Sequence, residues 1–205
     1  MIDSNAVLQH LGKDVRLQPL LNQFPFPVFD PNREVFSSLL KSIVSQQLSV
    51  KAAATIHQRF LQLFPDMEPD AEIILSLSDQ TLRSVGLSRQ KSSYIQNVAQ
   101  HFMEEKLLDT DWSSFTDQEI IQDLTRIKGV GQWTVEMVLM FTLQRPNVLP
   151  VADLGIQQAF EKLCGLDLQQ KKKALYIEMQ SIAKSWEPYR TFACIYLWQF
   201  KDLAS

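Results

Sequence analysis

A lysine followed by two closely spaced glycines, in the segment Lys128-Gly129-Val130-Gly131, has the composition of an anion-binding turn. Glycines let the chain reverse between two helices at no steric cost, and they let another surface approach the backbone closely. The N–H groups at the start of the following helix would point outward together, and such groups attract phosphate. The alternative is an ordinary helical hairpin closed by a glycine, and this segment alone does not separate the two.

Asp153, in the segment LPVADLGIQQAF (149–160), is the carboxylate best placed for chemistry. It follows a stretch kept extended by Pro150 and precedes a segment with helical spacing. The common role of an aspartate at such a junction is to cap the helix. A carboxylate held there can also face a cleft, so both interpretations remain open.

The elements that must position these residues are helices. Apolar residues recur at helical spacing over 36–44 and again over 53–64, with a short break between them where Ser49 can cap the second helix. Two more helices, over 77–85 and 88–102, meet at Gly86.

The helix that leads into the glycine turn is marked by Thr116 and Glu119, which have capping-box spacing. Further helical segments follow Pro150, and no stretch has the alternation of a convincing strand. We therefore predict an all-α fold with about nine or ten helices.

The charges are segregated along the chain, although the net charge is only -3. Residues 35–65 and 80–103 contain lysines and arginines but no acid, whereas 66–79 and 104–123 are strongly acidic. An acidic protein with such a pattern can still present a basic face to nucleic acid. The alternative is that acids simply gather in the connecting segments.

Several other classes of protein are not indicated. No apolar run reaches the roughly 18 residues of a membrane span, and the N-terminus lacks a secretory signal. The two cysteines, Cys164 and Cys194, are expected to be thiols in helices, and the three histidines lie near no cysteine pair. We expect an intracellular protein, in the cytoplasm or nucleoid, or in the nucleus if the source is eukaryotic.

Together these segments resemble the HhH-GPD superfamily of DNA glycosylases, in which a helix-hairpin-helix is followed by a Gly/Pro-rich segment and an aspartate. The matching residues are Leu124, Ile127, Gly129, Val130, Gly131 and Thr134 for the hairpin, and Pro150, Val151 and Asp153 for the loop. The segments SLLKSIVSQQLSVKAA (38–53), VGLSRQKSSYI (85–95) and SWEPYRTFACIYLWQF (185–200) resemble the 3-methyladenine DNA glycosylase II branch. The likeness extends over most of the chain.

The resemblance implies one glycosylase unit over 1–205, built from two helical lobes with the active site in the cleft between them. The lobes would be residues 33–149, a helical barrel with the hairpin, and residues 1–32 with 150–205. The bacterial enzyme that defines the branch has an extra N-terminal β-containing domain. Here the helix break lies within the first 50 residues, so we expect a compact form without that domain.

The resemblance also assigns roles in the reaction. Asp153 would stabilise the oxocarbenium-like sugar or activate the attacking water, as in glycoside hydrolysis. Trp133 and Trp198 would line the pocket of the extruded base, where cation-π attraction favours alkylated purines. Superfamily members that also cut the strand have a Schiff-base lysine at the position of Trp133, so we expect a monofunctional enzyme without lyase activity.

The remaining roles concern DNA binding. The hairpin residues Lys128, Gly129, Val130 and Gly131 would anchor the DNA backbone, and Gln47 or Leu48 would fill the gap left by the base. The carbonyls of Thr125, Ile127 and Val130 could hold a monovalent cation, Na⁺ or K⁺, and no cofactor is required. The expected partner is double-stranded DNA with alkylated bases, bound by a monomer that does not associate with a membrane.

Two alternatives stay open at this point. The chain could be a helix-hairpin-helix protein that binds damaged DNA without cutting it, or a glycosylase for oxidised or mismatched bases. Base release separates the first from an enzyme, and borohydride trapping would reveal a lyase.

Overall fold

The computed structural model describes residues 2–31 and 33–203, and the regular secondary structure among them is helical, with no strand. This confirms the all-α prediction. Within the described residues, no helix combines the length and the apolar character needed to cross a membrane.

The chain forms two compact units, which we call the terminal unit, Met1–Asp30 with Leu139–Ser205, and the middle unit, Pro31–Val138. Residues 139–149 therefore belong to the terminal unit. The terminal unit contains α1 (Ser4–Leu11), α2 (Gln18–Gln23), α10 (Leu154–Cys164), α11 (Lys172–Ala183), η3 (Lys184–Trp186) and α12 (Arg190–Leu203). The middle unit contains α3 (Val35–Ser45), α4 (Val50–Leu61), η1 (Pro65–Met67), α5 (Ala71–Ser76), α6 (Asp79–Ser84), α7 (Arg89–Glu104), η2 (Trp112–Ser114) and α8 (Asp117–Leu124). The boundary between the units falls within α9 (Gln132–Phe141).

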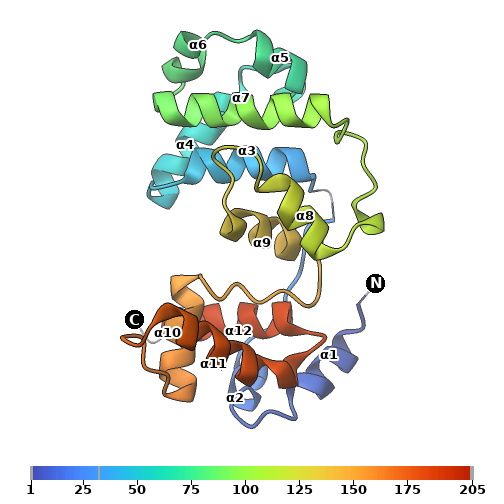
Figure 1. The fold of residues 1–205 in the computed structure, drawn as a ribbon, viewed down its shortest axis with the longest axis vertical. Helices are drawn as coiled ribbons and strands as arrows, with labels where there is room; N and C mark the ends of the chain where they lie inside the picture. The colour runs from blue at the N-terminus through green and yellow to red at the C-terminus, as the bar shows by residue number, and fades with distance from the viewer. Residues whose placement is uncertain (1, 32, 204–205) are drawn as a thin grey trace. The chain divides into compact units, whose positions relative to one another are not determined.

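The core of the middle unit lies where α3 packs against α7, the long green helix that runs alongside α3 in Figure 1. Leu39 and Ile43 of α3 and Ile95 and Val98 of α7 are fully buried there. Serine and threonine caps start the surrounding helices, as the sequence predicted: Ser49 accepts the N–H of Ala52, Ser88 that of Lys91, and Thr116 forms a complete capping box with Glu119.

The core of the terminal unit is built on α12, which packs against α10 and α2. Phe192 and Tyr196 of α12 and Phe160 of α10 are buried. Trp186 is also buried, and its indole Nε1 donates to Asp14 Oδ2 at 2.8 Å. Trp186 therefore has a structural role.

The predicted number of helices was too low, because the part of the chain that the structure describes contains twelve α-helices, three of them six residues long. The acidic segment 66–79 is not only a connection between helices, because it contains α5. Asp70 caps α5 by accepting the N–H of Ile73 at 2.8 Å. Such a short helix has little apolar periodicity of its own, and tertiary packing stabilises it.

Candidate active site

Asp153 caps α10, and the turn before it holds its backbone in place. The Asp153 N–H donates to the carbonyl of Pro150 at 3.0 Å, and the Asp153 Oδ1 accepts the N–H of Ile156 at 2.8 Å. The side-chain amide of Gln157 donates to the carbonyl of Val151 at 2.8 Å and so ties the turn to the helix. The predicted cap is confirmed, and the half-buried carboxylate is fixed by backbone geometry.

Trp198 of α12 makes a second contact to the same carboxylate oxygen. Its indole Nε1 donates to Asp153 Oδ1 at 2.9 Å, and its ring stacks on Phe141 with centroids 5.8 Å apart. The sequence suggested a wall of the base pocket and gave no sign of this hydrogen bond. The structure shows that Trp198 orients Asp153.

Gly155 makes the contact between Trp198 and Asp153 possible. A Cβ atom at this position would lie 3.0 Å from Cδ1 of Trp198 and 3.1 Å from Oδ1 of Asp153. Both distances are shorter than an ordinary van der Waals contact. The glycine therefore leaves the space in which the indole and the carboxylate meet.

A carboxylate that accepts two N–H groups on one oxygen is held in one orientation. Its chemistry is that of an acceptor. It can stabilise a positive charge that develops beside it, or it can take a proton from water.

The hairpin in the middle unit reverses at Gly129, which has φ +110°. A Cβ atom at Gly129 would lie 2.2 Å from Cγ of Tyr94, so the glycine packs directly on the face of that ring. Gly131 differs from Gly129, because no described heavy atom lies within 4 Å of the Cβ position there and its φ is not in the left-handed region. Only the first of the two glycines is required by the fold.

The helix that follows, α9, begins at Gln132, and helix geometry leaves the N–H groups of its first turn without intrahelical partners. Trp133 lies in this first turn with 44% of its surface exposed. Lys128 is exposed as well. The hairpin thus combines open backbone, a cation and an exposed aromatic ring within six residues of the chain.

The break between α3 and α4 is a type II turn over residues 45–48. The Leu48 N–H donates to the carbonyl of Ser45 at 3.3 Å, and Gln47 occupies the third position with φ 56°. That conformation is unusual for a residue with a side chain, and such residues often lie at functional sites. Gln47 is exposed and Leu48 has an exposed fraction of 38%.

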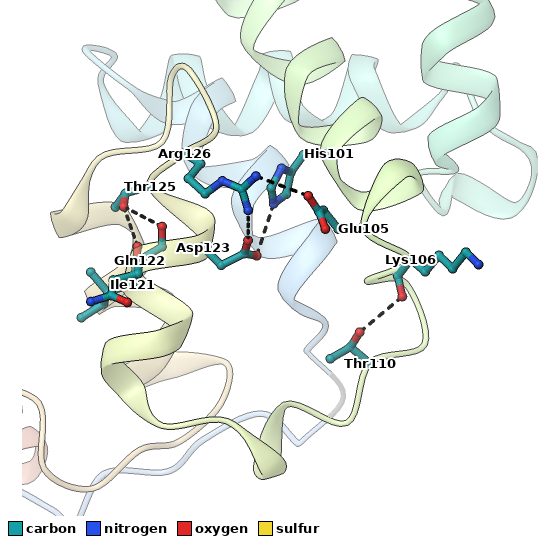
Figure 2. A network of polar contacts seen from close by, with 9 residues as sticks. All are labelled: His101, Glu105, Lys106, Thr110, Ile121, Gln122, Asp123, Thr125 and Arg126. Carbon is teal, nitrogen blue, oxygen red and sulfur yellow. Dashed lines mark hydrogen bonds and ion pairs between the residues drawn. The ribbon is translucent and has the colours of Figure 1, made fainter.

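Several basic residues of the middle unit have partners within the protein, and one of them is Arg83, which pairs with Asp79 at 3.8 Å. Arg126 pairs with Asp123 at 3.2 Å and with Glu105 at 3.4 Å, as Figure 2 shows. Lys91 is half-buried, and its Nζ donates to the carbonyl of Val44 at 2.8 Å. Other exposed cations of the middle unit are Lys41, Lys51, Arg59, Arg89 and Lys128.

The described residues contain no group of three or more histidine, cysteine or acidic side chains that could hold a metal ion. The carbonyl of Ile127 accepts the Val130 N–H at 3.0 Å, so it has one lone pair left for a cation. Cys164 and Cys194 are free thiols, as predicted.

The sequence profile described as "HhH-GPD superfamily base excision DNA repair protein" matches residues 40–186. DNA-3-methyladenine glycosylase 1 of Schizosaccharomyces pombe is 33% identical over 184 residues, which cover 86% of this chain and 78% of that protein.

Two solved structures share the fold over nearly the whole chain. The DNA-3-methyladenine glycosidase of Bacillus halodurans has a TM-score of 0.81 and 36% identity, covering 97% of this chain and 90% of the other. The Schizosaccharomyces pombe 3-methyladenine DNA glycosylase Mag1, in complex with abasic DNA, has a TM-score of 0.81 and 29% identity, covering 97% and 98%.

Proposed function

The chain belongs to the HhH-GPD superfamily of base excision DNA repair proteins, and on this premise we propose that it is a monofunctional DNA glycosylase for alkylated purines. The relatives at 33% and 36% identity are named for 3-methyladenine, which supports this substrate class. The observation that carries the proposal is the carboxylate of Asp153, held by the N–H of Ile156 and by the indole of Trp198.

The proposed reaction is hydrolysis of the bond between the base nitrogen and C1′ of the sugar. A purine methylated at N3 or N7 carries a positive charge, so it leaves with the bonding electron pair as a neutral base. Positive charge then develops on the sugar, and the fixed carboxylate of Asp153 stabilises it. Water adds its oxygen to C1′ and loses a proton, which leaves an abasic site.

Trp133 carries the proposal that the enzyme does not cut the strand. Cleavage of the strand by a related lyase requires an amine that forms a Schiff base with the sugar, and an indole has none. An exposed indole instead offers a face on which a cationic base can stack. Trp198 would contribute a second aromatic surface to the base in addition to orienting Asp153.

The middle unit would hold the DNA. The backbone of Gly129 to Gly131, with Lys128 beside it, would bind phosphate, and a monovalent cation on the carbonyls of Thr125, Ile127 and Val130 would add to this. The side chain of Gln47 or Leu48 would fill the gap that the extruded base leaves. The protein would act as a monomer.

The experiment that tests the proposal is release of 3-methyladenine and 7-methylguanine from methylated duplex DNA by the wild type and by Asp153→Asn. Asparagine is also a good helix cap, so the fold should be kept while excision falls about 100-fold or more. Asp70→Asn is the matched control, because Asp70 caps α5 with the same kind of bond and takes no part in the reaction. Equal excision by the wild type and Asp153→Asn would remove Asp153 from the mechanism.

The same reactions separate base release from strand cleavage. The wild type should leave abasic sites that break only after treatment with alkali, and borohydride should trap no covalent complex with DNA. A trapped complex would contradict the interpretation of Trp133. Tight binding without release of any base would favour a non-catalytic DNA-binding protein.

A further inference from the structure

One face of α7 holds the two segments of the middle unit that are proposed to touch DNA. Lys91, Tyr94, Asn97 and His101 follow one another at intervals of three, three and four residues, which places them along one side of the helix. Lys91 contacts the end of α3, Tyr94 and Asn97 contact the hairpin, and His101 contacts the end of α8.

Lys91 holds the end of α3. Its ammonium donates to the carbonyl of Val44 at 2.8 Å. A continuing helix would have paired this carbonyl with the N–H of Leu48, but that N–H turns back to Ser45. A lysine at the C-terminus of a helix also interacts favourably with the helix dipole. Partial burial of this ammonium lowers the pKa of Lys91.

Tyr94, Asn97 and His101 hold the hairpin and the helix before it. The ring of Tyr94 lies against Gly129, and the side-chain amide of Asn97 donates to the carbonyl of Lys128 at 3.0 Å. The imidazole of His101 lies 3.2 Å from Asp123 at the end of α8, as Figure 2 shows. The polar face of α7 therefore follows the chain from the end of α8 to the turn of the hairpin.

A direct bond joins the 45–48 turn to the hairpin. The Nε2 of Gln46 donates to the carbonyl of Gly129 at 3.3 Å. Gln46 directly precedes Gln47, the exposed residue with positive φ. The turn is thus fixed on one side by Lys91 and on the other by Gln46, and both bonds are to backbone carbonyls.

We propose that Lys91 and Gln46 are positioning residues that hold the 45–48 turn at a fixed distance from the hairpin. The side chain that fills the gap in the duplex would then enter the DNA at a fixed distance from the phosphates that the hairpin binds. The inference rests on the proposed function of these two segments. Neither residue is assigned a DNA contact. A side chain can replace an extruded base only if it enters the duplex at a fixed distance from the anchored phosphates, and small displacements from productive geometry cost rate.

The test uses the full chain with Lys91→Met and Gln46→Met, which remove the donors and keep side chains of similar length. Gln96→Met is the matched control. Gln96 also lies on α7, and its amide also donates to a backbone carbonyl, that of Leu77 at 3.2 Å, which belongs to neither segment. Gln46→Met keeps the test available if Lys91→Met does not fold.

Two measurements are made on each variant. The first is the rise in 2-aminopurine fluorescence when the protein unstacks this base beside a tetrahydrofuran abasic analogue. The second is the single-turnover rate of 7-methylguanine release at saturating enzyme. The salt dependence of binding to undamaged duplex is measured alongside.

We expect Lys91→Met and Gln46→Met to lower both the fluorescence rise and the excision rate about tenfold, the effect of losing one partly buried hydrogen bond. The slope of log K against log salt should not change, and Lys91→Arg should restore most of the rate. Gln96→Met should match the wild type in both measurements. A salt slope reduced by about one in Lys91→Met would make Lys91 a phosphate contact and overturn the proposal.

Unchanged extrusion and excision in both variants would also overturn the proposal. If the wild type releases no alkylated base, the proposed function fails. The fluorescence measurement needs no chemistry and still decides whether Lys91 and Gln46 position the turn.

Discussion

The indole N–H of Trp198 and the carboxylate of Asp153 meet at a single oxygen, Oδ1, which also receives the N–H of Ile156. A backbone donor from α10 and a side-chain donor from α12 thus converge on one atom. The same indole stacks on Phe141, so the ring is held in plane while its N–H is aimed. A tryptophan at this position supplies an aromatic surface and a hydrogen-bond donor together.

Trp198→Phe should separate these two properties. Phenylalanine keeps an aromatic ring to stack on Phe141 but donates no hydrogen bond, so Asp153 loses one of the two donors to Oδ1. We expect the single-turnover excision rate at saturating enzyme to fall about tenfold, with little change in DNA affinity. Trp198→Ala should lower both the excision rate and the DNA affinity. An unchanged rate in Trp198→Phe would show that the hydrogen bond does not contribute to the reaction.

Gly155→Ala should lower the excision rate while the free energy of unfolding changes little. Alanine gains about 1 kcal/mol of helix propensity over glycine. Crowding of the new methyl group against Trp198 and Asp153 costs about 1–3 kcal/mol, so the net loss of stability is small. The displaced indole should nevertheless lower the excision rate about tenfold. Chemical denaturation and single-turnover kinetics on the same preparation check this, and a rate equal to that of the wild type would contradict it.

Substitution of the two hairpin glycines by alanine should have very different effects on the stability of the protein. At Gly129 the methyl group would enter the ring of Tyr94 in a conformation unfavourable for L residues, so we expect a loss of about 3 kcal/mol or more in the free energy of unfolding. At Gly131 it would enter open space, so stability should change by less than about 1 kcal/mol.

The DNA affinity of Gly131→Ala tests whether the hairpin backbone binds a phosphate. Gly131→Ala should bind duplex DNA about tenfold more weakly, because its methyl group would stand between the backbone and a phosphate. A stable Gly131→Ala protein with the affinity of the wild type would argue against a phosphate at this turn.

The sequence predicted those parts of the fold that local chemistry determines. Ser49, Ser88 and Thr116 stand at the predicted helix starts because capping depends on residues close in the chain. Asp153 was placed correctly at a helix start for the same reason. Its role in the reaction stays a prediction.

Contacts between distant segments were beyond what spacing could indicate. Trp198 lies 45 residues from Asp153, and only the packing of α12 on α10 brings the indole N–H to the carboxylate. Lys91 was counted among the cations of a basic surface, because a charge count does not show that a lysine is half-buried against the end of another helix.

Asp14 should make the stability of the protein depend on pH. A hydrogen bond from the Arg16 side chain, with further bonds from Trp186 and the Arg16 backbone, holds the pKa of Asp14 below its ordinary value of 3.8, although burial opposes this. A carboxyl whose pKa is lower in the folded state stabilises the fold above the unfolded pKa, and this contribution is lost as the pH falls through the folded pKa.

Asp14→Asn should therefore lower the free energy of unfolding by about 2 kcal/mol at pH 7, the scale of a hydrogen-bonded charged group. The difference from the wild type should shrink as the pH falls from about 4, the ordinary pKa of an aspartate in the unfolded chain, through the lower pKa of folded Asp14. Urea denaturation of both proteins at pH 7 and pH 3 measures this. A difference that stays the same at both values would show that the ionised form of Asp14 does not stabilise the fold.

Trp133→Leu should change which lesions are excised. Leucine keeps an apolar surface but has no π-system, so it removes the attraction between the exposed indole and a cationic base, about 1–2 kcal/mol when desolvated. We expect excision of 7-methylguanine, which is cationic, to fall about tenfold relative to excision of the neutral lesion ethenoadenine. Trp133→Phe, which retains an aromatic face, should keep most of the preference.

Because both substrates are measured with the same protein, a fold defect would lower both rates and leave their ratio unchanged. An equal loss on both lesions would assign Trp133 a role in shape alone.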